Sequence, residues 1–261
     1  MSAFGFNPLY SGAGLAVGVL VGMTGVGGGS LMTPLLVLLF GFHPATAVGT
    51  DLLYASATKS VGTVVHGFGR TVDWQVVRRL ALGSVPATLL TLLAMHVIGT
   101  RFDGTDRLIT VTLGLALIAT AVAMLFRTRI VARFGHALDA VPERRITRWT
   151  VLLGAILGVL VSLSSVGAGA LGMTALLILY PKLPTNRLVG SDIAHAVPLT
   201  LIAGAGHWAM GSVDFGLLVS LLTGSIPGII IGSLISTRIS DALLRPILAG
   251  TLAIVGGKLL F

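Results

Sequence analysis

Long apolar stretches follow one another along the chain, and most charged residues lie in the short polar segments between them. A helix needs ~20 apolar residues to cross the hydrocarbon core of a membrane, and most of these stretches approach that length. Backbone polar groups find no water inside a bilayer, so each stretch is expected to form a helix. The stretches are 9–24, 29–42, 46–66, 74–98, 106–126, 149–164, 169–181, 187–208, 214–236 and 242–260.

Two stretches, 29–42 and 169–181, are short, and each begins within a glycine-rich sequence. The first sequence reads V-G-G-G-S-L over Val26–Leu31, and the second reads V-G-A-G-A-L over Val166–Leu171. Glycine lets the backbone turn without a Cβ clash, so both sequences predict a break between two helices inside the membrane. The short stretches are expected to be half-helices, re-entrant arms or tilted spans.

The second half of the chain repeats much of the first. Paired breaks at matching positions of two halves are a sequence feature of transporters built from duplicated membrane units. The pattern predicts a first repeat over 1–126, a connector over 127–148 and a second repeat over 149–261. The matches lie 140 residues apart for Val26 with Val166 and Pro44 with Pro184, and 141 apart for Thr50 with Ser191, Asp51 with Asp192, His66 with His207, and Asp73 with Asp214.

The connector 127–148 is rich in arginine, which places it on the cytoplasmic side. If the chain changes from one side of the membrane to the other five times in each half, the two halves have inverted topology and most cationic loop residues are cytoplasmic. Four changes give parallel halves and move four cations outside, so the charge bias favours inversion. The sequence thus predicts an all-α polytopic membrane protein with two pseudo-symmetric, inverted repeats and about eight to ten transmembrane or half-membrane helices.

Composition supports the membrane assignment. Of the 261 residues, 54% are hydrophobic and 10% are charged, whereas soluble domains carry roughly 25% charged residues. The net charge of +8 does not indicate nucleic acid, because the basic residues lie mainly in loops, as in multi-pass proteins of the cytoplasmic membrane. The chain has no cysteine, and its six histidines lack zinc-binding spacing, so neither a metal nor a cofactor is expected.

The two breaks are candidate anion sites. A helix that starts at a break has amides without intrahelical acceptors, and the helix dipole adds partial positive charge there. Such an end binds anions, although small residues also allow plain close packing of helices. The candidate substrate-binding residues of the breaks are Gly27, Gly28, Gly29 and Ser30 in the first, and Gly167 and Gly169 in the second.

Two carboxylates lie within apolar stretches. Asp51 and Asp192 are costly inside a membrane and are therefore candidate functional residues. They either brace the broken backbone or carry a coupling proton. The neighbouring hydroxyls of Thr50 and Ser191 are better suited to direct contact with an anion.

Lys59 and two histidines complete the candidate set. Lys59 lies about two helical turns beyond Asp51 and breaks the repeat, because its counterpart is Thr200. It is expected either to attract the anion, to pair with Asp51 or to extend toward the interface. His66 and His207 are candidates for proton transfer or for bracing.

The glycine-rich and acidic motifs resemble those of the TauE/SafE-type sulfite exporter family. The resemblance rests on Gly25–Leu36, Pro44–Leu52 and Leu188–Ile193, and it covers nearly the whole chain. It implies a bacterial-type permease for sulfur-containing anions. Ala168 and Ala170 stand where the first motif has Gly28 and Ser30, so the two breaks are expected to contribute unequally.

The expected function is therefore a secondary transporter that exports sulfite, sulfoacetate or another organosulfonate across the cytoplasmic membrane. A permease for a different small anion, or for a cation or metal, is the alternative, followed by an intramembrane enzyme or a structural membrane subunit. Neither G-x-S-x-G nor an ATP-binding G-x-x-x-x-G-K-[ST] loop occurs. The expected partners are the anion and the lipid bilayer, and small-residue faces permit a homodimer without requiring one.

Overall fold

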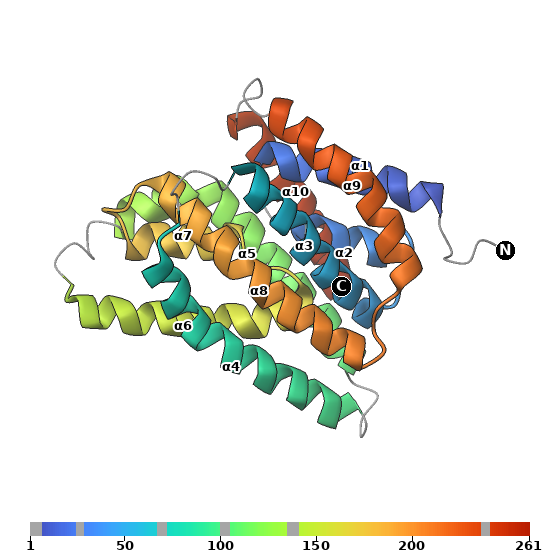
Figure 1. Ribbon diagram of the computed structural model, residues 1–261, viewed down its shortest axis with the longest axis horizontal. Helices are drawn as coiled ribbons and strands as arrows, with labels where there is room; N and C mark the ends of the chain where they lie inside the picture. Colours follow the sequence, from blue (N-terminus) through green and yellow to red (C-terminus); the bar gives the residue numbers. More distant parts are fainter. Residues whose placement is uncertain (1–6, 25–28, 67–71, 100–104, 135–140, 236–240) are drawn as a thin grey trace.

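The computed structural model describes residues 7–24, 29–66, 72–99, 105–134, 141–235 and 241–261 (Figure 1). Within these ranges the chain forms ten α-helices and no strand, which confirms the predicted all-helical fold. The helices are α1 Pro8–Thr24, α2 Gly29–Leu38, α3 Pro44–His66, α4 Trp74–Gly99, α5 Thr105–Phe134, α6 Glu143–Ser164, α7 Ala170–Leu179, α8 Thr185–Ala209, α9 Phe215–Ile235 and α10 Asp241–Leu260.

Several helices have the length and composition of membrane spans. Large apolar side chains face outward along them; Leu90 and Leu93 on α4, for example, are 66% and 59% exposed. A lipid environment covers such side chains, whereas water would not. Among the described residues, five helices are long and apolar enough to cross a membrane: Trp74–Val97, Arg107–Phe134, Glu143–Ser164, Thr185–Ala209 and Phe215–Gly232.

The short helices α2 and α7 have ten residues each, so each is about 15 Å long and spans only half of the hydrocarbon core. The helix α5 differs from expectation because it continues to Phe134, into the predicted connector. Arginines are good helix formers, and Arg127, Arg129 and Arg133 extend this helix instead of forming a loop.

Two helix pairs flank the centre, α1 with α9 and α4 with α6 (Figure 1). In both pairs, glycines lie directly against the backbone of the partner helix, where an added Cβ would clash. Small residues permit this close approach in membrane proteins. The contacts in one pair match those in the other at the offsets of 140 and 141 residues: Gly14 with Leu221 and Gly154 with Leu80, and Gly18 with Ser225 and Gly158 with Ser84.

The helices α3 and α8 pack against each other at the centre and run antiparallel, because Gly49 faces His207 while Gly204 faces Leu53. The helices α5 and α10 are also antiparallel neighbours, with Gly114 against Leu260 and Gly256 against Leu117. An antiparallel arrangement of corresponding helices is what a two-fold axis in the membrane plane requires. The duplication and its inversion stay predictions, and these contacts support them.

Candidate functional site

The first break separates α1 from α2, because α1 ends at Thr24 and α2 begins at Gly29. The predicted site residues Gly27 and Gly28 lie outside the described residues. Gly29 is the first residue of α2, and the adjacent Ser30 is buried in its first turn. The N-terminus of a half-length helix therefore lies inside the protein at this break.

The second break separates α6 from α7 and is described in full. Ser165 follows α6 in the left-handed conformation, with φ of 57°, and Gly167 and Gly169 have φ of 125° and 144°. Residues that carry a side chain rarely adopt these φ angles, which explains why glycine occupies positions 167 and 169. Gly169 caps α7 without any side-chain hydrogen bond, and the amide of Gly172 donates to the carbonyl oxygen of Gly167 at 3.0 Å. Helix geometry therefore leaves the first two amides of α7, those of Ala170 and Leu171, available to a ligand.

Lys59 of α3 reaches across to the second break. Its Nζ donates a hydrogen bond of 3.1 Å to the carbonyl oxygen of Ala168. It also interacts electrostatically with both Asp192 and Asp51. The counterpart Thr200 instead bonds within its own helix, to the carbonyl of Ala196. The cation that breaks the sequence repeat thus lies where the two halves meet.

Asp51 of α3 has no exposed surface. The hydroxyl of Thr33, on α2, donates a hydrogen bond to Oδ2 of this carboxylate. The Ser165 hydroxyl of the second break lies close to the same group. Within the described part of the chain, Asp51 Oδ1 and Ser165 Oγ have no hydrogen-bond partner. Asp51 therefore braces α2 with one oxygen and lies beside the Ser165 hydroxyl of the other half.

Asp192 of α8 occupies the corresponding place against α7. A Cβ built on Gly172 would lie 2.9 Å from Asp192 Oδ1, so the carboxylate packs directly on the short helix. Lys59 and, more weakly, Arg127 of α5 are the cations that act on it. Asp192 Oδ1 is buried and has no hydrogen-bond partner among the described residues.

His195 is a buried polar residue that the sequence reasoning missed. Its Nε2 lies 2.8 Å from the Ser84 hydroxyl, and its Nδ1 has no hydrogen-bond partner in the described ranges. Lys59 acts electrostatically on this ring as well. The counterpart of His195 is Tyr54, so the same signal that marks Lys59, a polar residue that departs from the repeat, would have found it.

Thr50 and Ser191, predicted to contact the substrate, bond to backbone instead. The Asp214 amide donates to Thr50 Oγ1 at 3.0 Å, and the Asp73 amide donates to Ser191 Oγ at 2.8 Å. Each hydroxyl thus holds the segment just before α9 or α4. Their contact with substrate stays a prediction, and these bonds favour a role in joining the halves.

The two predicted histidines are only partly described. His207 is fully buried, and its Nε2 lies 2.9 Å from the carbonyl oxygen of Ser162 on α6, which favours bracing. His66 is the last residue of α3, and its side chain lies outside the described residues. No group of three or more His, Cys, Asp or Glu residues that suits a metal ion occurs in the described part of the chain.

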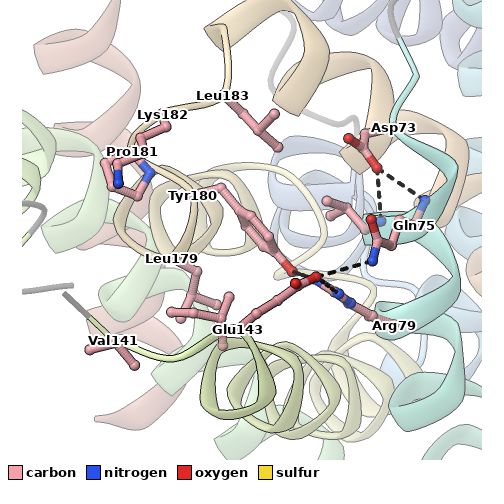
Figure 2. Close-up of a pocket in the computed structure, with 12 residues that line it drawn as sticks. Asp73, Gln75, Arg79, Val141, Glu143, Leu179, Tyr180, Pro181, Lys182 and Leu183 are labelled. Atoms are coloured by element: carbon pink, nitrogen blue, oxygen red, sulfur yellow. Dashed lines mark hydrogen bonds and ion pairs between the residues drawn. The ribbon is translucent and has the colours of Figure 1, made fainter. Parts of the chain in front are cut away.

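A pocket of about 300 Å³ opens at the end of the molecule where α4 and α6 begin and α7 ends (Figure 2). Glu143 bridges Arg79, at 2.6 Å, and Gln75, at 3.3 Å. The Tyr180 hydroxyl bonds both Arg79 and Thr150. This polar network joins α4 to α6 and to the end of α7.

An apolar layer runs along α7 from this pocket toward Asp192. Tyr180 lines the pocket and packs on the layer, and Met173 at its other end adjoins Gly172, which faces the carboxylate. The eight residue-to-residue steps from Gly172 to Tyr180 span about 12 Å along the helix axis. The buried residues of the layer are Val76, Leu80, Met173, Leu176 and Leu188.

Comparisons with known proteins agree with this architecture. The model of the family described as "Sulfite exporter TauE/SafE" matches residues 10–259. The chain is 38% identical to the probable membrane transporter protein YjnA of Bacillus subtilis (strain 168), over 95% of this chain and 97% of that protein. It is 29% identical to the probable membrane transporter protein YdhB of the same organism, over 94% and 96%.

A more distant relative is the probable membrane transporter protein MJ0441 of Methanocaldococcus jannaschii, 24% identical over 95% of this chain and 93% of that protein. No solved structure matches the chain. The family match and the relatives cover nearly the whole sequence, and the apolar helices have the lengths that a multi-pass membrane protein needs. The chain therefore belongs to the TauE/SafE sulfite exporter family of membrane transporters.

Proposed function

We propose that this protein is a secondary transporter that exports a small sulfur-containing anion, such as sulfite, sulfoacetate or another organosulfonate, across the cytoplasmic membrane. The observation that carries the proposal is the second break, where the N-terminus of α7 lies inside the protein and Lys59 reaches it from the other half. A helix N-terminus and a lysine ammonium both stabilise negative charge. The family match supports the same class of substrate.

The anion is bound by amides at the start of α7 and by the Lys59 ammonium, which exchanges the Ala168 carbonyl for the substrate. This exchange costs little, because the ammonium group has three N–H donors and is carried by a flexible side chain. Glycines at 167 and 169 keep the site free of side chains. The N-terminus of α2, with Gly29 and Ser30, contributes from the opposite half.

The membrane potential supplies the driving force for export. An inside-negative potential favours the outward movement of an anion by ~2.3 kcal/mol per charge for each 100 mV. The pocket beside Arg79 is the proposed cytoplasmic opening, since the arginine-rich segments lie at the same end. The apolar layer along α7 separates it from the carboxylates and is the proposed gate.

One observation favours an enzyme, namely the buried Ser84–His195 pair. A catalytic histidine needs a third group that orients its other nitrogen. His195 Nδ1 has no such partner within the described ranges, and the hydroxyl of Ser84 is buried. We therefore assign this pair to the packing of α4 on α8 rather than to hydrolysis.

The test is sulfite efflux from proteoliposomes under an imposed potential, with the purified protein. We expect efflux that depends on the protein and the voltage, is inhibited by excess sulfonate, and is unaffected by divalent cations. Lys59→Met should abolish it. Lys258→Met is the matched control, because this lysine is exposed near the end of α10. Inhibition by divalent cations but not by sulfonates would favour a cation permease.

A further inference from the structure

Four charged side chains interact with one another near the second break. Lys59 interacts with both Asp51 and Asp192, and Arg127 acts on Asp192 from α5. When all four are ionised their charges balance. Thr33 of α2 and Ser165 of the break lie beside Asp51, and Tyr54, one turn along α3, interacts with it; His195 lies one turn along α8 from Asp192.

Four polar atoms in this cluster are buried without a hydrogen-bond partner among the described residues: Asp51 Oδ1, Asp192 Oδ1, Ser165 Oγ and His195 Nδ1. Buried polar atoms are almost always satisfied, so a group of exceptions indicates a missing ligand, ion or water. Two of the four are carboxylate oxygens, which only accept. Whatever satisfies them must therefore donate a hydrogen bond or be positively charged, and a proton bound to the carboxylate itself is one such solution.

Bracing of the backbone explains only part of this arrangement. The bond from Thr33 accounts for Asp51 Oδ2, and the close approach of Gly172 accounts for the place of Asp192. The Ser165 hydroxyl lies beside Asp51, but neither contact accounts for Asp192 Oδ1, which has no hydrogen-bond partner among the described residues.

Resting on the proposed function, we infer that Asp51 and Asp192, linked through Lys59, bind the proton that accompanies the transported anion. The cluster lies in surroundings of low dielectric constant, where adding the negative charge of an anion is costly. A proton bound to one Oδ1 restores part of the charge balance. Binding of the two is therefore mutually favourable, and this linkage is reciprocal.

The proton comes from water on the side to which the site is open and leaves with the anion on the other side. Doubly charged sulfite with one proton carries one net negative charge, so the membrane potential still drives its export. A monovalent sulfonate with one proton moves as a neutral pair, and voltage does not drive it. The inference thus predicts different voltage dependence for the two substrates.

The first test is infrared spectroscopy of the purified protein in lipid, which detects the carbonyl stretch of a protonated carboxyl without requiring transport. Adding sulfite at neutral pH should produce or strengthen such a band. Asp51→Asn or Asp192→Asn should remove it, whereas Glu143→Gln, which changes an exposed carboxylate, should not. If sulfite produces no band that either buried variant removes, the inference is overturned.

The second test is sulfite flux at fixed voltage with a pH difference across the proteoliposome membrane. One coupled proton should change the equilibrium sulfite ratio about tenfold per pH unit, which corresponds to ~1.36 kcal/mol. Sulfite itself binds protons near neutral pH, so the measured quantity is the difference between the wild type and Asp51→Asn/Asp192→Asn. An equal response of both proteins would contradict proton coupling.

A further variant and the flux itself separate the remaining explanations. Asp192→Glu keeps a carboxyl and should keep the pH response, so its loss together with correct folding would count against a proton site. Absence of any sulfite flux from folded wild type would reject the proposed function. The infrared result is independent of flux, so the two failures can be told apart.

Discussion

The two halves use the same contacts for their scaffold and different residues at their centre. Gly14 and Gly154 make equivalent contacts with the neighbouring helix, as do the hydroxyls of Thr50 and Ser191 with backbone amides. By contrast, Lys59 corresponds to Thr200. The contacts that obey the repeat are shared by both halves, whereas Lys59, which departs from it, bonds to the second break.

In a duplicated membrane protein, substrate ligands are expected at the positions where the two halves differ. A structural contact can be shared, because both halves must pack in the same way. A single substrate and a single coupling charge need only one set of ligands, and symmetry would supply two. We therefore propose that Lys59, which has no counterpart in the other half, marks the substrate side of the centre.

The largest expected effect comes from exchanging the residues at the unequal position. Lys59→Thr should lower sulfite efflux at least about 30-fold, because removing a charged group that binds a buried anion costs about 2–5 kcal/mol of binding free energy. Efflux from proteoliposomes at matched protein content measures this loss.

Two companion variants sharpen this experiment. Thr200→Lys tests whether a second cation at the centre substitutes for the first. In the double exchange Lys59→Thr/Thr200→Lys, efflux should stay low, because the second break would lack the ammonium that bonds to it. Recovery of efflux in the double variant would show that the two breaks are equivalent.

A smaller effect is expected in the shared scaffold. Gly154→Ala places a Cβ against the Leu80 carbonyl and should destabilise the protein by about 1–3 kcal/mol. Gly14→Ala should cost a similar amount, because it meets the Leu221 carbonyl. Thermal unfolding in detergent measures both.

The matched control is Gly250→Ala on α10, where nothing lies within 4 Å of the added Cβ. Because alanine favours helix over glycine, it should leave Tm unchanged or slightly raised. Equal losses in all three variants would mean that the close helix contacts do not limit stability.

The smallest expected effect is a difference in unfolding free energy between variants of two buried serines at corresponding positions. Ser84→Ala removes the partner of His195 Nε2 and should cost about 1–3 kcal/mol of unfolding free energy. Ser225→Ala removes a hydroxyl that lies beside that of Tyr54, the counterpart of His195, without a well-formed hydrogen bond among the described residues, so it should cost less than Ser84→Ala. Chemical denaturation of the two variants side by side distinguishes them, and equal losses would contradict the assignment of the Ser84–His195 bond.

The sequence was sufficient to predict the all-helical architecture, because apolar stretches of membrane length leave the backbone few alternatives. It also located the second break, since Gly167 and Gly169 adopt angles that other residues avoid. The end of α5 was missed because arginines were taken as loop markers, although they also favour helix.

The contacts between the halves could not be predicted. The Lys59 bond to Ala168 joins residues more than 100 positions apart and depends on how α3 packs beside the break. Likewise, Thr50 and Ser191 lie next to buried carboxylates in the sequence, yet their hydroxyls bond backbone amides of other segments. Such partners follow from tertiary packing, which spacing along one chain does not specify.

The most direct test of the account is an experimental structure of the protein with selenite, in which selenium replaces the sulfur of sulfite and is located by its anomalous scattering. The account predicts a selenium peak at the second break, within hydrogen-bonding reach of Lys59 Nζ and of the first amides of α7. A peak confined to the pocket beside Arg79, with the second break vacant in protein that transports sulfite, would contradict it.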